Sequence, residues 1–108
     1  MNYATSSDVK PTKPKRADYG WVKRVTTRLF RYMWEHSNVY RTCGKYRQAI
    51  MRTQLLNYVR QTMMANTPYP DYKSVPESER PGVQEIMYRI GKQYIDDKEK
   101  CNWGSLGS

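Results

Sequence analysis

Few side chains in this sequence have the types and spacing that catalysis requires. His36 is the single histidine, which excludes a metal site with two histidine ligands, and Cys43 follows it seven residues later. A cysteine and a histidine can act together as nucleophile and base, but His36 closes an apolar helical pattern, and we interpret it as a packing residue. The motifs CxxC, HExxH and GxSxG and a glycine-rich phosphate loop are absent. The sequence therefore predicts a protein that is not an enzyme, with no catalytic residues and no metal ligands.

Acidic side chains gather in two places, Glu77 with Glu79 and Asp96 with Asp97 and Glu99. Acids at the start of a helix complement its positive end, and acids near the other end are commonly solvated. We therefore expect helix-end charges at both places rather than a pair of carboxylates that does chemistry.

Positive charge is concentrated in the first two-thirds of the chain. The 108 residues carry a formal net charge of +9. Residues 1–66 hold 13 of the 19 basic side chains and three acids, a net +10, whereas residues 67–108 hold six basic and seven acidic side chains, a net −1. This imbalance indicates an acidic partner, which can be nucleic acid, an anionic lipid surface or an acidic protein.

Three helices must position these charges. We expect an extended basic arm over residues 1–17, a helical domain over residues 18–100 and a short tail without periodicity over residues 101–108. A loop over residues 67–82 contains four prolines and separates the second helix from the third. No strand pattern or repeat is present, so the fold class predicted is all-α, a three-helix bundle.

The helix ends are marked by individual residues. Asp18 is a good N-cap for a first helix ending around Ser37–Asn38, the second helix runs from Thr42 or Gly44 to Asn66, and Pro81 suits the first turn of the third. The predicted core stripes are Trp21, Val22, Val25, Leu29, Met33 and His36 in the first helix; Tyr46, Ala49, Ile50, Thr53, Leu56, Val59 and Met63 in the second; and Val83, Ile86, Met87, Ile90 and Tyr94 in the third.

Two cationic stripes follow from helical spacing at about 100° per residue. They consist of Arg24, Arg28 and Arg31 in the first helix and of Arg41, Lys45 and Arg52 around the start of the second. No acid occurs between residues 36 and 70, so nothing nearby in the sequence neutralises the second stripe. With tyrosines interleaved, such stripes suit phosphates and stacked bases or an acidic protein; the plainer alternative is two solvated helix faces.

Cys43 and Cys101 are too few for a disulfide framework, and we expect two unpaired thiols, with a single disulfide as the alternative. No apolar run approaches the roughly 20 residues of a membrane span. The N-terminal residues lack the apolar core of a secretory signal.

The tripeptide Leu29-Phe30-Arg31 resembles the Leu-Tyr-Arg motif of LYR-motif proteins, with phenylalanine in place of tyrosine. Its setting is similar as well, early in the first of three predicted helices of a basic chain. Residues 59–66 (VRQTMMAN) resemble the end of the family's second helix, and Lys45-Tyr46-Arg47 resembles a segment of an LYR subunit of respiratory complex I. The resemblance covers about residues 19–98.

This resemblance implies a three-helix mitochondrial adaptor that binds the acyl carrier protein, which is acidic and helical. The cofactor implied is the acyl-phosphopantetheine of that partner, slotted between the helices, with none bound covalently to this chain. Arg31 would contact the carrier's acidic helix or the phosphate of its prosthetic group, and Phe30 would pack toward the helix interface. The other docking residues implied are Leu29, Arg28, Arg41, Lys45 and Arg52.

The function favoured is therefore an accessory subunit of a respiratory-chain complex, complex I, on the matrix side of the inner mitochondrial membrane, among other subunits. Membrane contact is expected to be peripheral at most, through residues near Trp21, Lys23 and Arg24. The alternative is a small basic mitochondrial ribosomal or RNA-binding protein, whose affinity for RNA would fall steeply with salt.

Overall fold

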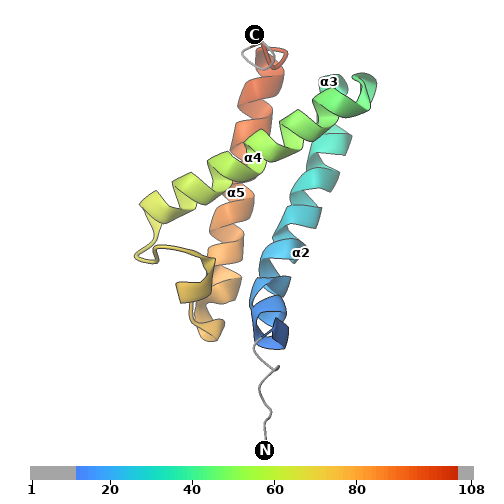
Figure 1. Cartoon of the computed structure of the whole chain (residues 1–108). Helices are drawn as coiled ribbons and strands as arrows, with labels where there is room; N and C mark the ends of the chain where they lie inside the picture. The colour runs from blue at the N-terminus through green and yellow to red at the C-terminus, as the bar shows by residue number, and fades with distance from the viewer. Residues whose placement is uncertain (1–11, 105–108) are drawn as a thin grey trace, which may run out of the picture.

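The computed structural model describes residues 12–104, and within them it contains helices, turns and loops but no strand. Three long helices make up the fold: α2 (Thr12–His36), α4 (Lys45–Asn66) and α5 (Arg80–Lys100). In Figure 1, α2 and α5 run side by side and α4 crosses them at an angle. The prediction of an all-α three-helix bundle is confirmed.

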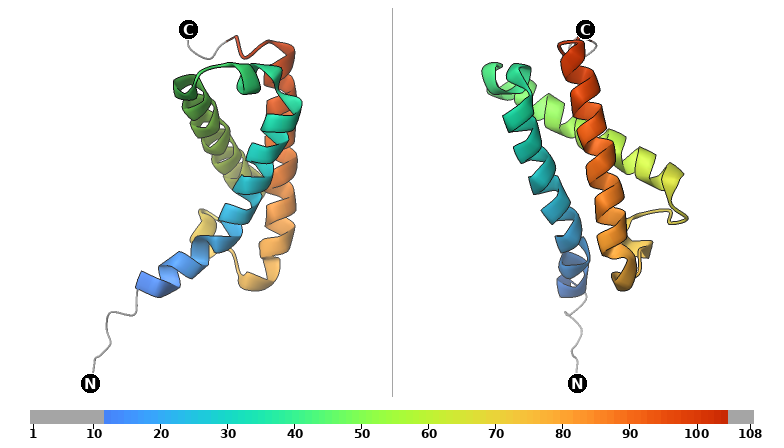
Figure 2. Two further views of the ribbon diagram at one scale, coloured as in Figure 1. Left: turned by 90° about the vertical axis from the view of Figure 1, so that its right-hand side faces the viewer. Right: turned by 180° about the vertical axis from the view of Figure 1, so that it is seen from behind.

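Helix α5 is central because it packs against both α2 and α4. A short helix, α3 (Asn38–Thr42), joins α2 to α4, and from it the two long helices diverge (Figure 2). The connection from α4 to α5 contains two 3-10 turns, η1 (Tyr72–Ser74) and η2 (Glu77–Glu79). Pro81 lies in the first turn of α5, as predicted. Backbone N–H groups in the first turn have no partner within the helix, so the N–H that proline lacks costs no intrahelical hydrogen bond.

The core is a single cluster of side chains from all three helices, closed at one end by Val75 and at the other by Tyr40 and Trp103. Its helical members are Trp21, Val25, Leu29 and Met33 of α2, Met51, Leu55, Val59 and Met63 of α4, and Val83, Met87 and Ile95 of α5. Leu29 lies directly over Gly91, where a Cβ atom would stand only 2.4 Å from Leu29 Cδ2. Glycine at this position lets α2 and α5 approach closely.

The start of the first helix differs from the prediction. Helix α2 begins at Thr12, so residues 12–17, predicted to be part of the extended arm, are helical. Pro14 lies in the first turn, where it interrupts no intrahelical hydrogen bond. The rest of the predicted arm, residues 1–11, lies outside the described residues. The helical domain therefore begins six residues before Asp18.

The face that α4 buries also differs from the prediction. Val59 and Met63 are buried as expected and Leu56 is half-buried, but Met51 and Leu55 complete the stripe. Tyr46, Ala49 and Thr53 are exposed instead, with 82% of Tyr46 accessible. The apolar residues of α4 occur on several sides of the helix, so spacing alone did not identify the face that packs on α5.

The tail prediction is wrong for Trp103, which is completely buried in the core. The chain turns back after α5 through Asn102 and Trp103, whose φ angles of 53° and 55° are left-handed. The Trp103 N–H donates to the Lys98 carbonyl at 2.8 Å and the Asn102 N–H to the Glu99 carbonyl at 3.0 Å. This pair of bonds is a Schellman motif, which satisfies the last carbonyls of the helix. Residues 105–108 lie outside the described residues.

Two smaller expectations have clear outcomes. Cys43 and Cys101 are free thiols, as predicted. His36 is exposed rather than part of the apolar face, and its ring stacks on Tyr32 with 4.1 Å between ring centres.

Candidate functional site

The three residues that resemble the LYR motif point in three directions from α2. Leu29 is completely buried against Gly91, so it is a core residue and cannot touch a partner. Phe30 is half-buried, and the Arg52 guanidinium lies over its ring at 5.9 Å. Arg31 is exposed, and it makes no hydrogen bond or ion pair with the described residues. Of the three, only Arg31 presents its charge to an external molecule.

Arg28 and Arg31 line the same small cleft, of about 150 Å³, between α2 and α5. Tyr32, Glu35 and Tyr88 complete its lining. The Arg28 guanidinium lies 3.8 Å from the centre of the Tyr88 ring, a cation–π contact that fixes its position. The cleft thus has one arginine held against an aromatic wall and a second, Arg31, that has no hydrogen bond or ion pair among the described residues. Tyr88 contributes to this cleft although nothing in its sequence context marks it.

The wall of this cleft is held by Tyr32. Its hydroxyl donates to Asp96 of α5 at 2.8 Å. Burial and this hydrogen bond to a carboxylate raise the pKa of Tyr32 to about 12, so the phenol stays protonated at any physiological pH. Tyr32 is therefore a fixed support and not a proton donor or acceptor for chemistry.

Arg52 is placed on the other side of α2 and is largely engaged within the chain. Besides the contact with Phe30, its guanidinium donates to the Tyr40 hydroxyl at 2.9 Å. The Tyr40 ring in turn makes an edge contact with Trp34, whose ring centre is 6.2 Å away and which is 52% exposed. Trp34 is an exposed aromatic side chain that sequence periodicity did not single out.

Arg41 and Lys45 do not share one face of the second helix, because Arg41 belongs to α3. The Arg41 guanidinium donates to the carbonyls of Trp34 at 2.7 Å and Glu35 at 3.1 Å, which are left open at the end of α2. Arg41 is therefore a C-terminal cap of α2. Lys45 is exposed at the first residue of α4. The predicted stripe of Arg41, Lys45 and Arg52 is thus divided among three separate environments.

A buried polar cluster fixes α3 between the long helices. Ser37 is completely buried and caps α3 by accepting from the Tyr40 N–H at 3.1 Å. Glu99 of α5 accepts from the Ser37 hydroxyl, from the Trp103 indole N–H at 2.9 Å and from the Asn38 N–H at 2.9 Å. Burial alone would raise the pKa of Glu99, but the hydrogen bonds outweigh it and lower the pKa below its ordinary value. The predicted solvated helix end is therefore partly structural.

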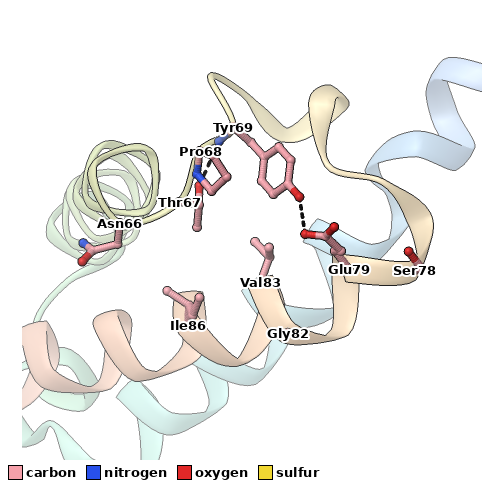
Figure 3. A pocket seen from close by; sticks show the side chains of 9 residues that line it. All are labelled: Asn66, Thr67, Pro68, Tyr69, Ser78, Glu79, Gly82, Val83 and Ile86. Carbon is pink, nitrogen blue, oxygen red and sulfur yellow. Dashed lines mark hydrogen bonds between the residues drawn. The ribbon is translucent and has the colours of Figure 1, made fainter.

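A separate cavity of about 370 Å³ lies between the end of α4 and the start of α5 (Figure 3). Val83 and Ile86 point into it from α5, and Tyr69 lies over it and donates from its hydroxyl to Glu79. Glu79 is the single charged residue of its lining, so this cavity places no second carboxylate, histidine or cysteine beside it.

The described residues contain no group of three or more histidine, cysteine, aspartate or glutamate side chains placed to hold a metal ion. Every helix in residues 12–104 is too short or too polar to cross a bilayer. Comparison of the chain with family models, curated proteins and solved structures gave no match. Functional inference therefore rests on the surfaces of this chain itself.

Proposed function

We propose that this protein is a non-catalytic helical adaptor that docks an acidic partner on the cationic face of α2, defined by Arg24, Arg28 and Arg31. The observation that carries the proposal is the state of these arginines. All three are exposed, and none has an ion-pair partner among the described residues. Exposed arginine is a favoured interface residue, and an acidic surface is the natural complement to three such groups in a row.

The partner we propose is an acyl carrier protein, within a mitochondrial respiratory-chain complex such as complex I. Support comes from the likeness of Leu29-Phe30-Arg31 to the LYR motif together with the exposure of Arg31 at the mouth of the α2–α5 cleft. In this proposal Arg31 forms charge-assisted hydrogen bonds with carboxylates or with the phosphate of the carrier's prosthetic group. Arg28, held against Tyr88, presents a second cation at a fixed place, and Leu29 contributes only through the core.

The experiment is an isothermal calorimetric titration of the purified chain with acyl carrier protein. We expect Arg31→Ala to raise the Kd about tenfold or more, the usual effect of truncating an arginine hot spot. Arg89→Ala is the matched control, because Arg89 is equally cationic and exposed but lies on the outer side of α5. Circular dichroism of both variants should match the wild type. Equal affinity of the two variants would refute the role of Arg31.

RNA is the competing partner, because Trp34 lies on α2 itself, is about half exposed and can stack on a base. A fluorescence titration with single-stranded RNA at several salt concentrations distinguishes the two partners. Tight RNA binding with a steep salt slope, weakened more by Arg31→Ala than by Arg89→Ala, would replace the carrier protein by nucleic acid on this face.

A further inference from the structure

The outer face of α4 is largely exposed, and it combines apolar side chains with uncharged polar ones. Six residues line a shallow hollow of about 390 Å³ along it, and all of them belong to α4. We call these the α4 outer face: Tyr46, Ala49, Ile50, Thr53, Gln54 and Asn57. The core stripe lies on the opposite side of the helix, and of these six residues only Ile50 is half-buried and packs against the core. Tyr46, 82% exposed, projects most strongly.

This face carries no charge in a chain where 27% of residues are charged. By comparison, the outer side of α5 presents Glu85, Arg89 and Asp97, as a solvated helix normally does. Along α4 the first exposed cations are Lys45, just before the hollow, and Arg60, one turn beyond it. The neutral hollow between them spans about 16 Å at 1.5 Å per residue, which is the length of three helical turns.

The positive charges at the two ends of the α4 outer face favour some classes of binding partner over others. Arg47 and Arg52, the other cations of this stretch, are half-buried and donate to other parts of this chain. A second copy of the chain is disfavoured, because antiparallel pairing of two α4 helices sets Lys45 against Arg60, and parallel pairing sets each cation against its own copy. No acid between residues 36 and 70 can relieve either arrangement. A nucleic acid is disfavoured as well, since its phosphates would lie over the neutral centre of the face.

We propose that the α4 outer face binds an amphipathic helix of a partner protein, with small apolar residues at its centre and carboxylates that reach Lys45 and Arg60. A helix laid along such a face buries its apolar side against Tyr46 and Ile50, and the charges at the ends set its position along α4. This surface is separate from the cationic face of α2, so the adaptor has room for two partners at once.

The test uses two labelled helical peptides of about 18 residues and the full-length protein. One peptide has alanine and leucine at its centre and glutamate at both ends; the other has the same composition with the glutamates at the centre. Fluorescence anisotropy should give a Kd at least tenfold lower for the first peptide. Amide shifts in NMR should map to residues 46–57. Equal affinity for both peptides would mean general attraction to a +9 protein and would overturn the proposal.

Matched variants localise the binding. Thr53→Glu sets a negative charge in the hollow, and Gln93→Glu sets the same charge on the exposed side of α5, away from both the hollow and its end cations. We expect Thr53→Glu to weaken the end-charged peptide at least tenfold and Gln93→Glu to weaken it about twofold or less. Equal effects of the two variants would overturn the proposal, as would dimerisation of the free chain that Thr53→Glu abolishes. Arg31→Ala should leave peptide binding unchanged, so failure of the carrier-protein proposal would be seen separately.

Discussion

Close packing of Leu29 on Gly91 gives the sharpest test of the fold. In Gly91→Ala the new Cβ would stand 2.4 Å and 2.6 Å from the two terminal carbons of Leu29 and 3.1 Å from its Cγ. Leu29 is completely buried, so its side chain can turn away only by moving against other core side chains. Overpacking of this kind costs about 1–3 kcal/mol, against a gain of about 1 kcal/mol because alanine favours the helix over glycine.

A second glycine separates these two effects. Gly20 lies inside α2, and a Cβ added there meets nothing within 4 Å. Gly20→Ala should therefore show only the helix-propensity gain, of up to about 1 kcal/mol. Subtracting the two variants removes that gain and leaves the overpacking cost of about 1–3 kcal/mol. Urea unfolding followed by circular dichroism measures both free energies. If Gly91→Ala were as stable as Gly20→Ala, the close approach of α2 and α5 would be refuted.

A double-mutant cycle then tests whether Leu29 is the residue that clashes. Leu29→Ala alone should cost about 2–5 kcal/mol, because it opens a cavity in the core. In the double variant the methyl group that Gly91→Ala adds occupies part of that cavity, and the clash is gone. The combined loss should therefore be smaller than the sum of the single losses by about 1 kcal/mol or more. Additive losses would mean that the strain of Gly91→Ala lies elsewhere.

Three further predictions concern the end of the bundle where α3 and the chain terminus meet. Trp103→Phe keeps an aromatic ring but removes the N–H that donates to Glu99. It should lower the free energy of unfolding by about 1–3 kcal/mol in urea titrations. A loss below about 0.5 kcal/mol would contradict the hydrogen-bonded role of the indole. Because the pKa of Glu99 is lowered, its stabilisation is present at neutral pH and is lost as the pH falls through that lowered value. Thermal melts of Glu99→Gln should therefore lose less stability than the wild type as the pH falls below the ordinary value of 4.5, and parallel curves would argue against the carboxylate. Arg41→Ala removes the donor to two carbonyls at the end of α2 and should lower the free energy of unfolding by about 1 kcal/mol in the same assay. The affinity for carrier protein should stay unchanged. A weaker affinity would mean that Arg41 belongs to the docking surface.

How much the sequence predicted depended on how clearly each helix separates apolar from polar residues. In α2 the buried residues recur at every fourth position with arginine on the other side, and Trp21, Val25, Leu29 and Met33 were identified correctly. In α4 two neighbouring stripes are equally apolar, because Ile50 adjoins Met51 and Leu56 adjoins Leu55. Packing on α5, a long-range effect, decides between them, and local spacing does not encode it.

Trp103 shows a different kind of failure. A lone tryptophan after the last helical turn has no periodicity, so pattern analysis assigned it to a tail. The local sequence nevertheless held a usable signal, since asparagine is one of the few residues that readily adopt the left-handed conformation at a helix C′ position. Asn102 occupies that position, and the residue after it commonly packs back on the helix. A C-terminal cap motif would thus have predicted that Trp103 returns to the core.

The fate of the arginines narrows what the net charge of +9 means for partners. Arg41 and Arg52 donate hydrogen bonds to carbonyls and a tyrosine of this same chain. They therefore attract an acidic partner less strongly than their sequence positions suggest. Two sets of the other exposed cations bear on partners: a continuous row on α2, and single charges at the two ends of the neutral face of α4. Further exposed cations, such as Arg89 of α5, belong to neither set. A continuous row suits an extended acidic surface, whereas a neutral face with charged ends suits one helix set in one register. Because the two arrangements suit different partners, the two proposals together assign the α2 and α4 surfaces to two different acidic proteins rather than to one.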